Sequence, residues 1–226
     1  MTTSPELLLT VWLSPSFPVG AFAYSHGLEW AVEAGDVADV KTLVAWLTDL
    51  VEHGSARNDC ILFAEAFRAT RIDDRVALAA VNELAIALAP SSERRLEAMQ
   101  QGRSFLDAIA SAWPAPGVAG ARDVLDGDVA YPVAVGLAAG AHDIPLPRAC
   151  EAYVLGFVAN LVSAAVRLSV VGQTQGQAAL AALAPAISAL GAFAAQSSLD
   201  DLGSAAFRSD ISSMRHETQY SRLFRS

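Results

Sequence analysis

Apolar residues recur every three or four positions over much of this chain, whereas runs that alternate between apolar and polar residues are scarce. The clearest case is residues 40–51, where valine and leucine follow the i, i+3, i+4, i+7 spacing behind a capping residue, Asp39. The same spacing recurs over 76–88 and 92–113. Because one face of a helix repeats every 3.6 residues and one face of a strand every two, this pattern predicts an all-α fold.

The second half of the chain is more apolar and predicts further helices. One is expected to start at Pro132, and residues 146–172 are apolar on most faces, which is typical of a long central helix. Residues 114–128 hold prolines and glycines that could mark a domain boundary. We nevertheless expect a single-domain helical bundle, because each half has wide apolar faces for the other half to cover.

Ala178–Ala195 raises the question of a membrane, because these 18 residues carry no charge. That length barely reaches a membrane span. The stretch is mostly alanine, contains Pro185 and Gly191, and lacks flanking lysine or arginine, so we expect a buried helix of a soluble protein. The small residues nearby, such as Gly136 and Gly140, are expected to let helix backbones approach closely.

Acidic residues outnumber basic ones by 24 to 15, which gives a net charge of −9, and Lys41 is the only lysine. Binding to nucleic acid depends on neutralising phosphates with lysine and arginine, so the composition argues against a nucleic-acid partner. The two cysteines, Cys60 and Cys150, form no CxxC motif and no zinc-like cluster with histidine. The N-terminus lacks the basic region of a signal peptide, and we expect a cytoplasmic protein.

The sequence contains no motif for a nucleotide, a cofactor or a catalytic nucleophile. Two functional alternatives nevertheless stay open. One is an all-α enzyme that uses His26 or His216 with Glu29 or Glu217 as an acid–base pair. The other is a metal-binding protein, for which His216–Glu217 is the most suggestive pair. Adjacent helical residues point about 100° apart and do not chelate together, so a metal site is not expected.

Residues 15–29 join a loop rich in proline and glycine to a short helix with aromatic and polar side chains. Tyr24, His26 and Glu29 bring polar groups next to aromatic rings. Such a set is either a hydrogen-bonded network at the edge of the core, or a binding surface or cavity wall, and the spacing does not distinguish them.

The C-terminal segment, defined as residues 204–226, is too polar for a core helix. On a helix its apolar residues form one narrow stripe, made of Phe207, Ile211, Met214 and Thr218. Ordering a backbone costs roughly 1–2 kcal/mol per residue, more than so thin a stripe recovers. We therefore expect residues 1–203 to form the helical domain and residues 204–226 to form a tail that orders only on a partner.

Three blocks of the sequence resemble a known family. They are "PSFPVGAFAYSHGLE" (15–29), "NLVSAAVRLSVVGQTQGQ" (160–177) and "SLDDLGSAAFRSDISSMRHETQYSRLFRS" (198–226). The chain is similar here, and in the order of the helical segments between the blocks, to the urease accessory protein F family. The resemblance covers most of the chain.

The resemblance implies an all-α, often dimeric protein without catalytic activity, cofactor or resident metal. Its implied partners are a D/H-type urease accessory protein, a nickel-carrying G-type GTPase and apo-urease. The implied role is to bridge the first two on apo-urease and to regulate the GTPase while the nickel centre of urease is assembled. A nickel-storage protein is the remaining alternative that involves metal, and it needs more clustered ligands than four histidines offer.

Two sets of site residues follow from the matched blocks. Those expected to dock the D/H-type protein are Arg208, Asp210, Met214, Arg215, His216, Tyr220, Arg222 and Arg225. Those expected at a dimer contact, at the GTPase contact or along a polar passage for nickel are Tyr24, His26, Glu29, Arg167, Gln173 and Gln177. The three roles of the second set stay open.

Overall fold

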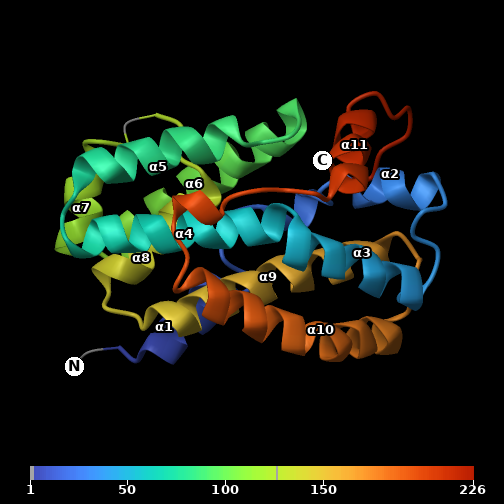
Figure 1. The fold of residues 1–226 in the computed structure, drawn as a ribbon, viewed down its shortest axis with the longest axis horizontal. Coiled ribbons are helices and arrows are strands. Elements are labelled where there is room, and N and C mark those ends of the chain that lie inside the picture. Colours follow the sequence, from blue (N-terminus) through green and yellow to red (C-terminus); the bar gives the residue numbers. More distant parts are fainter. Residues whose placement is uncertain (1–2, 126) are drawn as a thin grey trace.

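The computed structural model describes residues 3–125 and 127–226, and these residues form helices and no β-strand. The predicted all-α fold is confirmed (Figure 1). In chain order the elements are α1 (Pro5–Trp12), η1 (Ala21–Ala23), α2 (Leu28–Glu33), α3 (Val40–His53), α4 (Ser55–Arg71), α5 (Arg75–Ala87), α6 (Ser92–Ala112), α7 (Pro116–Arg122), α8 (Tyr131–Ala141), α9 (Leu146–Arg167), α10 (Gln173–Ala194), η2 (Leu199–Asp201) and α11 (Phe207–His216), where η marks a short 3-10 helix.

Several helices begin where the sequence predicts. Asp39 accepts a hydrogen bond from the Thr42 amide at 2.8 Å, and the Thr42 hydroxyl accepts one from the Asp39 amide at 3.0 Å. This reciprocal cap fixes the start of α3. Helix α6 begins at Ser92 behind the Ser91 hydroxyl, which accepts from the Arg94 amide. The predicted loop at 114–128 contains a short helix, α7, that packs on α6 and α8.

The centre of the bundle is α4, which contacts α3, α5, α8, α9 and α10 (Figure 1). Its buried residues include Cys60 and Phe63. The expectation of a long central helix over 146–172 is not confirmed. The helix there, α9, ends at Arg167, packs chiefly on α10, and exposes residues such as Leu155. It also contacts α2, α3, α4 and α8, so α9 lies within the bundle beside α4 but is not its centre.

Glycines let α8 lie directly on α4. A side chain at Gly136 would collide with the carbonyl group of Phe63, and one at Gly140 would lie 2.9 Å from the Phe67 carbonyl oxygen. The close approach predicted for these glycines is therefore present.

Helices α9 and α10 are long and apolar enough to cross a membrane, by length and composition only. They pack on each other, and α10 also packs on α3 and α4. The prediction of a buried helix over 178–195 needs correction, because only 33% of the most apolar window of α10 is buried. One face, which includes Leu183 and Ile187, is buried, and the outer face carries alanine, a residue tolerated in water.

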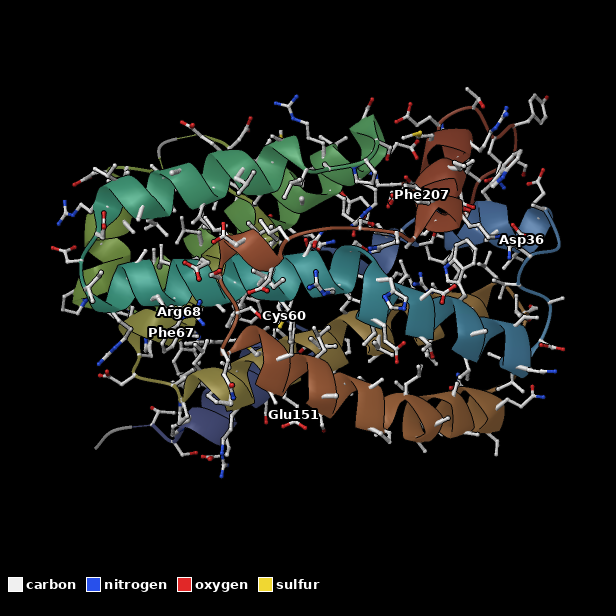
Figure 2. All side chains as sticks on the ribbon, viewed as in Figure 1. Asp36, Cys60, Phe67, Arg68, Glu151 and Phe207 are labelled. Carbon is white, nitrogen blue, oxygen red and sulfur yellow. The ribbon has the colours of Figure 1, made fainter. Side chains whose placement is uncertain are left out.

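The end of α10 is fixed by Arg68 of α4, which is labelled in Figure 2. Its guanidinium donates to the Ser197 carbonyl oxygen at 2.8 Å and to the Ala195 carbonyl oxygen at 2.9 Å. Unsatisfied carbonyl groups at the end of a helix favour such a cation. The chain then runs through η2 toward α11.

The C-terminal segment does not have the structure that the sequence predicts for it. The expectation of a tail that stays frayed without a partner is wrong in this structure, because α11 packs on α2 and the last residue, Ser226, is 1% exposed (Figure 1). The apolar stripe does not provide this packing. Hydrogen bonds to carboxylates of α2 and α6 provide it together with buried Phe224, and helical periodicity within the segment does not reveal such partners.

Candidate functional site

Two segments far apart in the sequence meet at one site, since Ser25 and Ser226 are 201 positions apart. The amide and hydroxyl groups of Ser25 donate to the Ser226 carbonyl oxygen at 2.7 and 2.5 Å, and the Arg225 amide donates to the Ala23 carbonyl oxygen at 2.8 Å. The segment before α2 and the last residues of the chain therefore run side by side. Residues 15–29 and residues 204–226, both singled out in the sequence, form one structural unit.

Glu29, in the first turn of α2, is the main acceptor for the C-terminal segment. Its carboxylate accepts from the Leu223 amide at 2.6 Å and from the Phe224 amide at 2.9 Å, and it lies 3.2 Å from His216 Nε2. Glu29 is buried, so these bonds are shielded from water. Charged hydrogen bonds in such surroundings are stronger than neutral ones.

His216 lies between two carboxylates and is fully buried. Its Nε2 faces Glu29, and its Nδ1 lies 2.6 Å from a carboxylate oxygen of Glu93 on α6. The other oxygen of Glu93 accepts from the Arg222 guanidinium at 2.6 Å. Of the histidine–glutamate pairs considered for acid–base chemistry, His216 lies beside Glu29 and not beside Glu217, which accepts from the Ser92 amide. A fully buried imidazole also has no access to a substrate.

A second charged cluster surrounds Glu97 on α6, which is 2% exposed. Its carboxylate pairs with Arg94 and with His26 Nε2, the latter at 2.8 Å, and accepts from Gln101 at 2.9 Å and from the Ser226 hydroxyl at 2.7 Å. Burial alone would raise the pKa of Glu97, but Arg94, His26 and these hydrogen bonds hold it at about 2. His26 therefore pairs with Glu97 and not with Glu29, which was one of the alternatives that the sequence left open.

Arg167, at the end of α9, connects both segments. Its guanidinium lies 3.6 Å from the centre of the Phe22 ring and 4.3 Å from the centre of the Phe224 ring, and it donates to the Phe22 carbonyl oxygen at 2.5 Å. A guanidinium between two aromatic rings is held by cation–π attraction on both faces. Arg167 thus ties the N-terminal and C-terminal segments to α9.

Four of the six residues predicted for a dimer contact, a GTPase contact or a passage belong to this unit. Besides His26, Glu29 and Arg167, Tyr24 hydrogen-bonds Gln100 of α6. The other two, Gln173 and Gln177, are exposed on the first turns of α10 and take no part in the described network.

The eight residues predicted to dock a partner divide between inward and outward positions. His216 and Arg222 bond to carboxylates of the body, and Arg208 pairs with Asp36 while its side chain stays 72% exposed. Asp210 is half-buried, and burial raises the pKa of its carboxyl group. The remaining four, whose side chains are exposed, are Met214, Arg215, Tyr220 and Arg225.

Helix α11 packs through its polar side and exposes its apolar side. Ser212, Ser213 and His216 are buried, whereas the outer stripe, defined as Phe207, Ile211 and Met214, is 67%, 54% and 49% exposed. The close contact uses Gly27, whose φ is +76° and where a Cβ would lie 2.6 Å from the Ser213 nitrogen. The backbone of α11 rests on that glycine, which turns the outer stripe to solvent.

The sequence interpretation missed three of the charged residues of α6. Glu93, Arg94 and Glu97 fall in a stretch predicted as an ordinary amphipathic helix. Their positions in the sequence could have revealed them, because Arg94 and Glu97 lie on the same helical face as the core residue Phe105. Charged residues on a buried face need partners, which here come from both ends of the chain.

Asp59 on α4 offers a test of the electrostatics beside this cluster. Burial raises its pKa from 3.8 to about 6, against the opposing charge of Arg94. Between those values the folded chain holds more protons than the unfolded chain, so its stability falls as the pH rises through this window. Asparagine does not ionise, so Asp59→Asn avoids this loss of stability. The variant is expected to raise the free energy of unfolding at pH 7 by about 2 kcal/mol.

Urea denaturation of both proteins at pH 4 and pH 7 checks this prediction. The gain of the variant is expected to be small at pH 4 and large at pH 7. An equal effect at both values would contradict the raised pKa of Asp59.

Metal ligands do not converge in the described part of the chain. Over residues 3–125 and 127–226, no group of three or more histidine, cysteine or acidic residues is arranged to hold a metal ion. In the two buried clusters, the histidines and carboxylates are engaged with each other and with arginine and backbone donors.

Comparisons with known proteins place the chain in a family. Residues 37–184 match the pattern of the UreF family, and a urease accessory protein UreF of Xanthobacter autotrophicus is 60% identical over 220 residues, covering 97% of this chain and 90% of the relative. This chain belongs to the UreF family. The UreF protein of Methylobacterium radiotolerans is also 60% identical, over 97% of this chain and 96% of its own length. A UreF protein of Rhodopseudomonas palustris is 53% identical over 218 residues. UreF proteins are urease accessory proteins, so the predicted family is confirmed.

Proposed function

We propose that this UreF chain is a non-catalytic adaptor in urease maturation. It docks a D/H-type accessory protein and a G-type nickel-carrying GTPase on apo-urease in the cytoplasm, and it regulates that GTPase. Nickel is the cargo of this assembly. Membership in a family of urease accessory proteins supports the general role. By holding its partners together, an adaptor raises their effective concentration.

The observation that carries the proposal is the outer stripe of α11. Three apolar side chains face water on a helix whose opposite side is held by buried hydrogen bonds. Tyr220 and Leu223, which follow α11 in the same segment, are also exposed. Aromatic, methionine and arginine side chains are enriched at the centres of protein interfaces. We therefore propose residues 204–226 as the docking segment for the D/H-type protein.

The eight proposed docking residues have two roles in this view. Met214, Arg215 and Tyr220 contact the partner directly, together with the exposed side chains of Arg208 and Arg225. His216 and Arg222 hold the segment on the body, and half-buried Asp210 lies between the two groups. Because the segment is ordered beforehand, little conformational entropy is lost when the partner binds.

A charge placed in the outer stripe tests the docking proposal. Ile211→Asp is expected to weaken binding to the D/H-type protein by at least about a hundredfold, because it places a carboxylate in an apolar interface. The stability of the isolated chain is expected to change by less than about 0.5 kcal/mol, since the position is exposed. Pull-down and calorimetric titration with purified partner measure the first effect, and urea denaturation measures the second.

Val76→Asp is the matched control, because Val76 is 82% exposed on α5. It is expected to bind the D/H-type protein normally. Normal binding by Ile211→Asp would refute the docking role of the outer stripe. This test is sharper than deleting residues 208–226, which would also remove hydrogen-bond donors from Glu29, Glu93 and Glu97.

The six residues of the second predicted set receive their roles according to whether their side chains are exposed or engaged inside the protein. Gln173 and Gln177 are open to solvent, so we propose them for the GTPase contact or a homodimer contact. Tyr24, His26, Glu29 and Arg167 are proposed as the internal support of the docking segment.

A further inference from the structure

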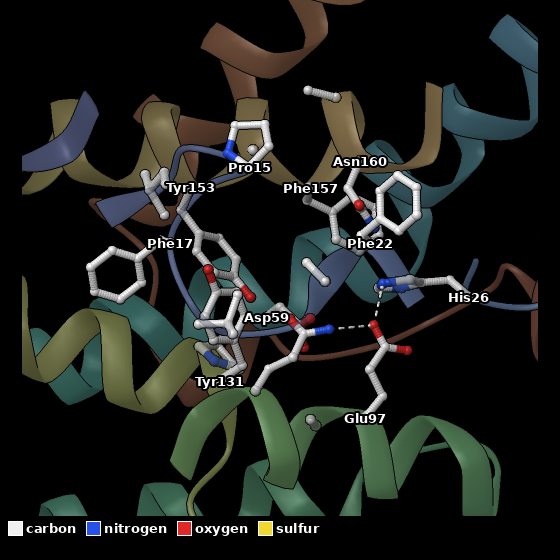
Figure 3. Close-up of a pocket in the computed structure, with 18 of the residues that line it drawn as sticks. Pro15, Phe17, Phe22, His26, Asp59, Glu97, Tyr131, Tyr153, Phe157 and Asn160 are labelled. Carbon is white, nitrogen blue, oxygen red and sulfur yellow. Dashed lines mark hydrogen bonds and ion pairs between the residues drawn. The ribbon is translucent and has the colours of Figure 1, made fainter. Parts of the chain in front are cut away.

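A cavity of about 170 Å³ lies between the N-terminal loop and helices α4, α6, α8 and α9 (Figure 3). Six aromatic side chains line it, namely Trp12, Phe17, Phe22, Tyr131, Tyr153 and Phe157. In the view of Figure 3, Phe17 lies on one side of the cavity, and Phe22 and Phe157 lie on the other. A protein cavity of about 150 Å³ can hold a molecule the size of benzene. The space therefore suits one molecule of that size with aromatic rings around it.

The charged residues that line the cavity are Asp59, Arg94 and Glu97. Arg94 and Glu97 form an ion pair with each other, and the pKa of Glu97 is about 2, so both are charged. Burial and the charge of Arg94 lower the pKa of His26, which also lines the cavity, so its ring is neutral at pH 7. With Asp59 ionised, the lining has two negative groups and one positive group, which gives it a net negative charge.

Asp59, on α4, is the charged group of the lining that lacks a counterion. Among the described residues it forms no ion pair, whereas Arg94 is paired with Glu97. Burial raises the pKa of Asp59 to about 6, because the charge of Arg94 and a hydrogen bond from Tyr153 do not offset the loss of water. At pH 7 the carboxyl group is mostly ionised, and its side chain keeps accessible surface. A cation in the cavity would supply the missing opposite charge.

The aromatic lining indicates which kind of cation fits. Aromatic faces attract cations, and proteins recognise quaternary ammonium groups with cages of aromatic residues. A methylated ammonium group presents apolar methyl groups to such rings and needs few or no hydrogen-bond acceptors. A metal ion would need several converging ligands, and no such group is present among residues 3–125 and 127–226.

The cavity can be reached from solvent beside η1. Phe22 lines it and is 67% exposed, and the lining residues Pro15 and Ser163 are also exposed. Arg167 packs on the Phe22 ring without lining the cavity, so it does not act as the counterion of Asp59.

We propose that this cavity binds a small organic cation that carries a methylated ammonium group, with the cation among the aromatic rings and Asp59 as its counterion. Attraction between the two charges acts over several ångströms and does not require a hydrogen bond. The site is separate from the outer stripe and does not depend on the adaptor role.

Titration of the full chain with tetramethylammonium and with tert-butanol at pH 7 tests the proposal. The two molecules are similar in size, and tert-butanol is neutral and easier to remove from water. Binding by apolar contact alone would favour tert-butanol, whereas the rings and Asp59 are expected to make tetramethylammonium bind about tenfold more tightly. Calorimetry or ligand-observed NMR measures both affinities.

Asp59→Asn tests the counterion without loss of the fold, because this variant is expected to be more stable than the wild-type chain. It is expected to bind tetramethylammonium at least about tenfold more weakly and tert-butanol as before. Asp49→Asn is the matched control, since it removes one negative charge at an exposed position of α3. It is expected to bind both molecules as the wild-type chain does.

A cavity-filling variant locates the site. Gly156 lines the cavity, and a Cβ there would meet Leu13 at an ordinary contact distance of 3.8 Å. Gly156→Leu is therefore expected to occupy the space and abolish binding of tetramethylammonium. Ala181→Leu, at an exposed position of α10, is the control that keeps binding. Circular dichroism establishes that each variant is folded.

Three results would overturn the proposal. The first is no saturable binding of tetramethylammonium by the wild-type chain, and the second is binding of tert-butanol that is equally tight. The third is undiminished binding of tetramethylammonium by folded Asp59→Asn or Gly156→Leu. The comparison of the two molecules in the wild-type chain does not depend on whether a variant folds.

Discussion

Glu29→Ala is expected to release the C-terminal segment while leaving the rest of the bundle folded. The substitution removes the acceptor for the Leu223 and Phe224 amides and one carboxylate beside His216. Leaving such buried donors unpaired costs about 3 kcal/mol in all, which corresponds to a fall in amide protection of about a hundredfold. Hydrogen exchange measured by mass spectrometry over residues 207–226 checks this.

Glu83→Ala is the control, since Glu83 is exposed on α5. It is expected to leave the exchange of residues 207–226 unchanged. If Glu29→Ala exchanged as slowly as the wild-type chain, the segment would be held by other contacts. If the proposed docking to the D/H-type protein holds, the same variant is expected to bind that protein more weakly although its outer stripe is intact, because the stripe then has to be ordered during binding.

Glu97→Gln is expected to destabilise the whole fold. The amide keeps the shape of the carboxyl group but removes the charge that balances Arg94, which is 8% exposed. Leaving a buried charge without its partner costs about 3–5 kcal/mol. Urea denaturation at pH 7 measures this loss, and Glu83→Gln is the exposed control.

The pH dependence separates lost charge from lost packing. Because the pKa of Glu97 falls from 4.5 to about 2 on folding, its contribution is fully present above pH 4.5 and is lost as the pH falls toward 2. The difference in stability between the wild-type chain and Glu97→Gln is therefore expected to be constant from pH 7 to pH 5 and to shrink below pH 4. A difference that stayed constant down to pH 2 would contradict an electrostatic origin.

Helices with one apolar face and a good cap could be predicted from the sequence. Helix α3 satisfies both conditions through Asp39 and its leucine spacing. Helix α4 was missed although it is the centre of the bundle. Its buried positions include Ile61, Leu62, Phe63 and Ala64 in succession, and such a run interrupts the spacing of three or four residues that marks one apolar face. Because other helices cover α4 on most sides, its apolar residues do not form the single stripe by which a helix is recognised in a sequence.

The parts of the site could be predicted, but their arrangement could not. Residues 15–29 and 204–226 stand out by composition, and both take part in the network. The bond from Glu29 to His216 joins residues 187 positions apart, and no local spacing encodes it. The entropy estimate for the tail failed for the same reason, since it counted the apolar stripe and omitted carboxylates supplied by other helices.

The orientation of α11 has a consequence for how copies of the chain behave in a concentrated solution. Phe207, Ile211 and Met214 stand together in water on a molecule whose net charge is −9. Charge repulsion keeps such molecules apart at low ionic strength. Added salt screens this repulsion and leaves the exposed apolar surface unchanged. Chain that is in excess over a binding partner is therefore expected to aggregate as the salt concentration rises. This favours production of the two proteins in equal amounts.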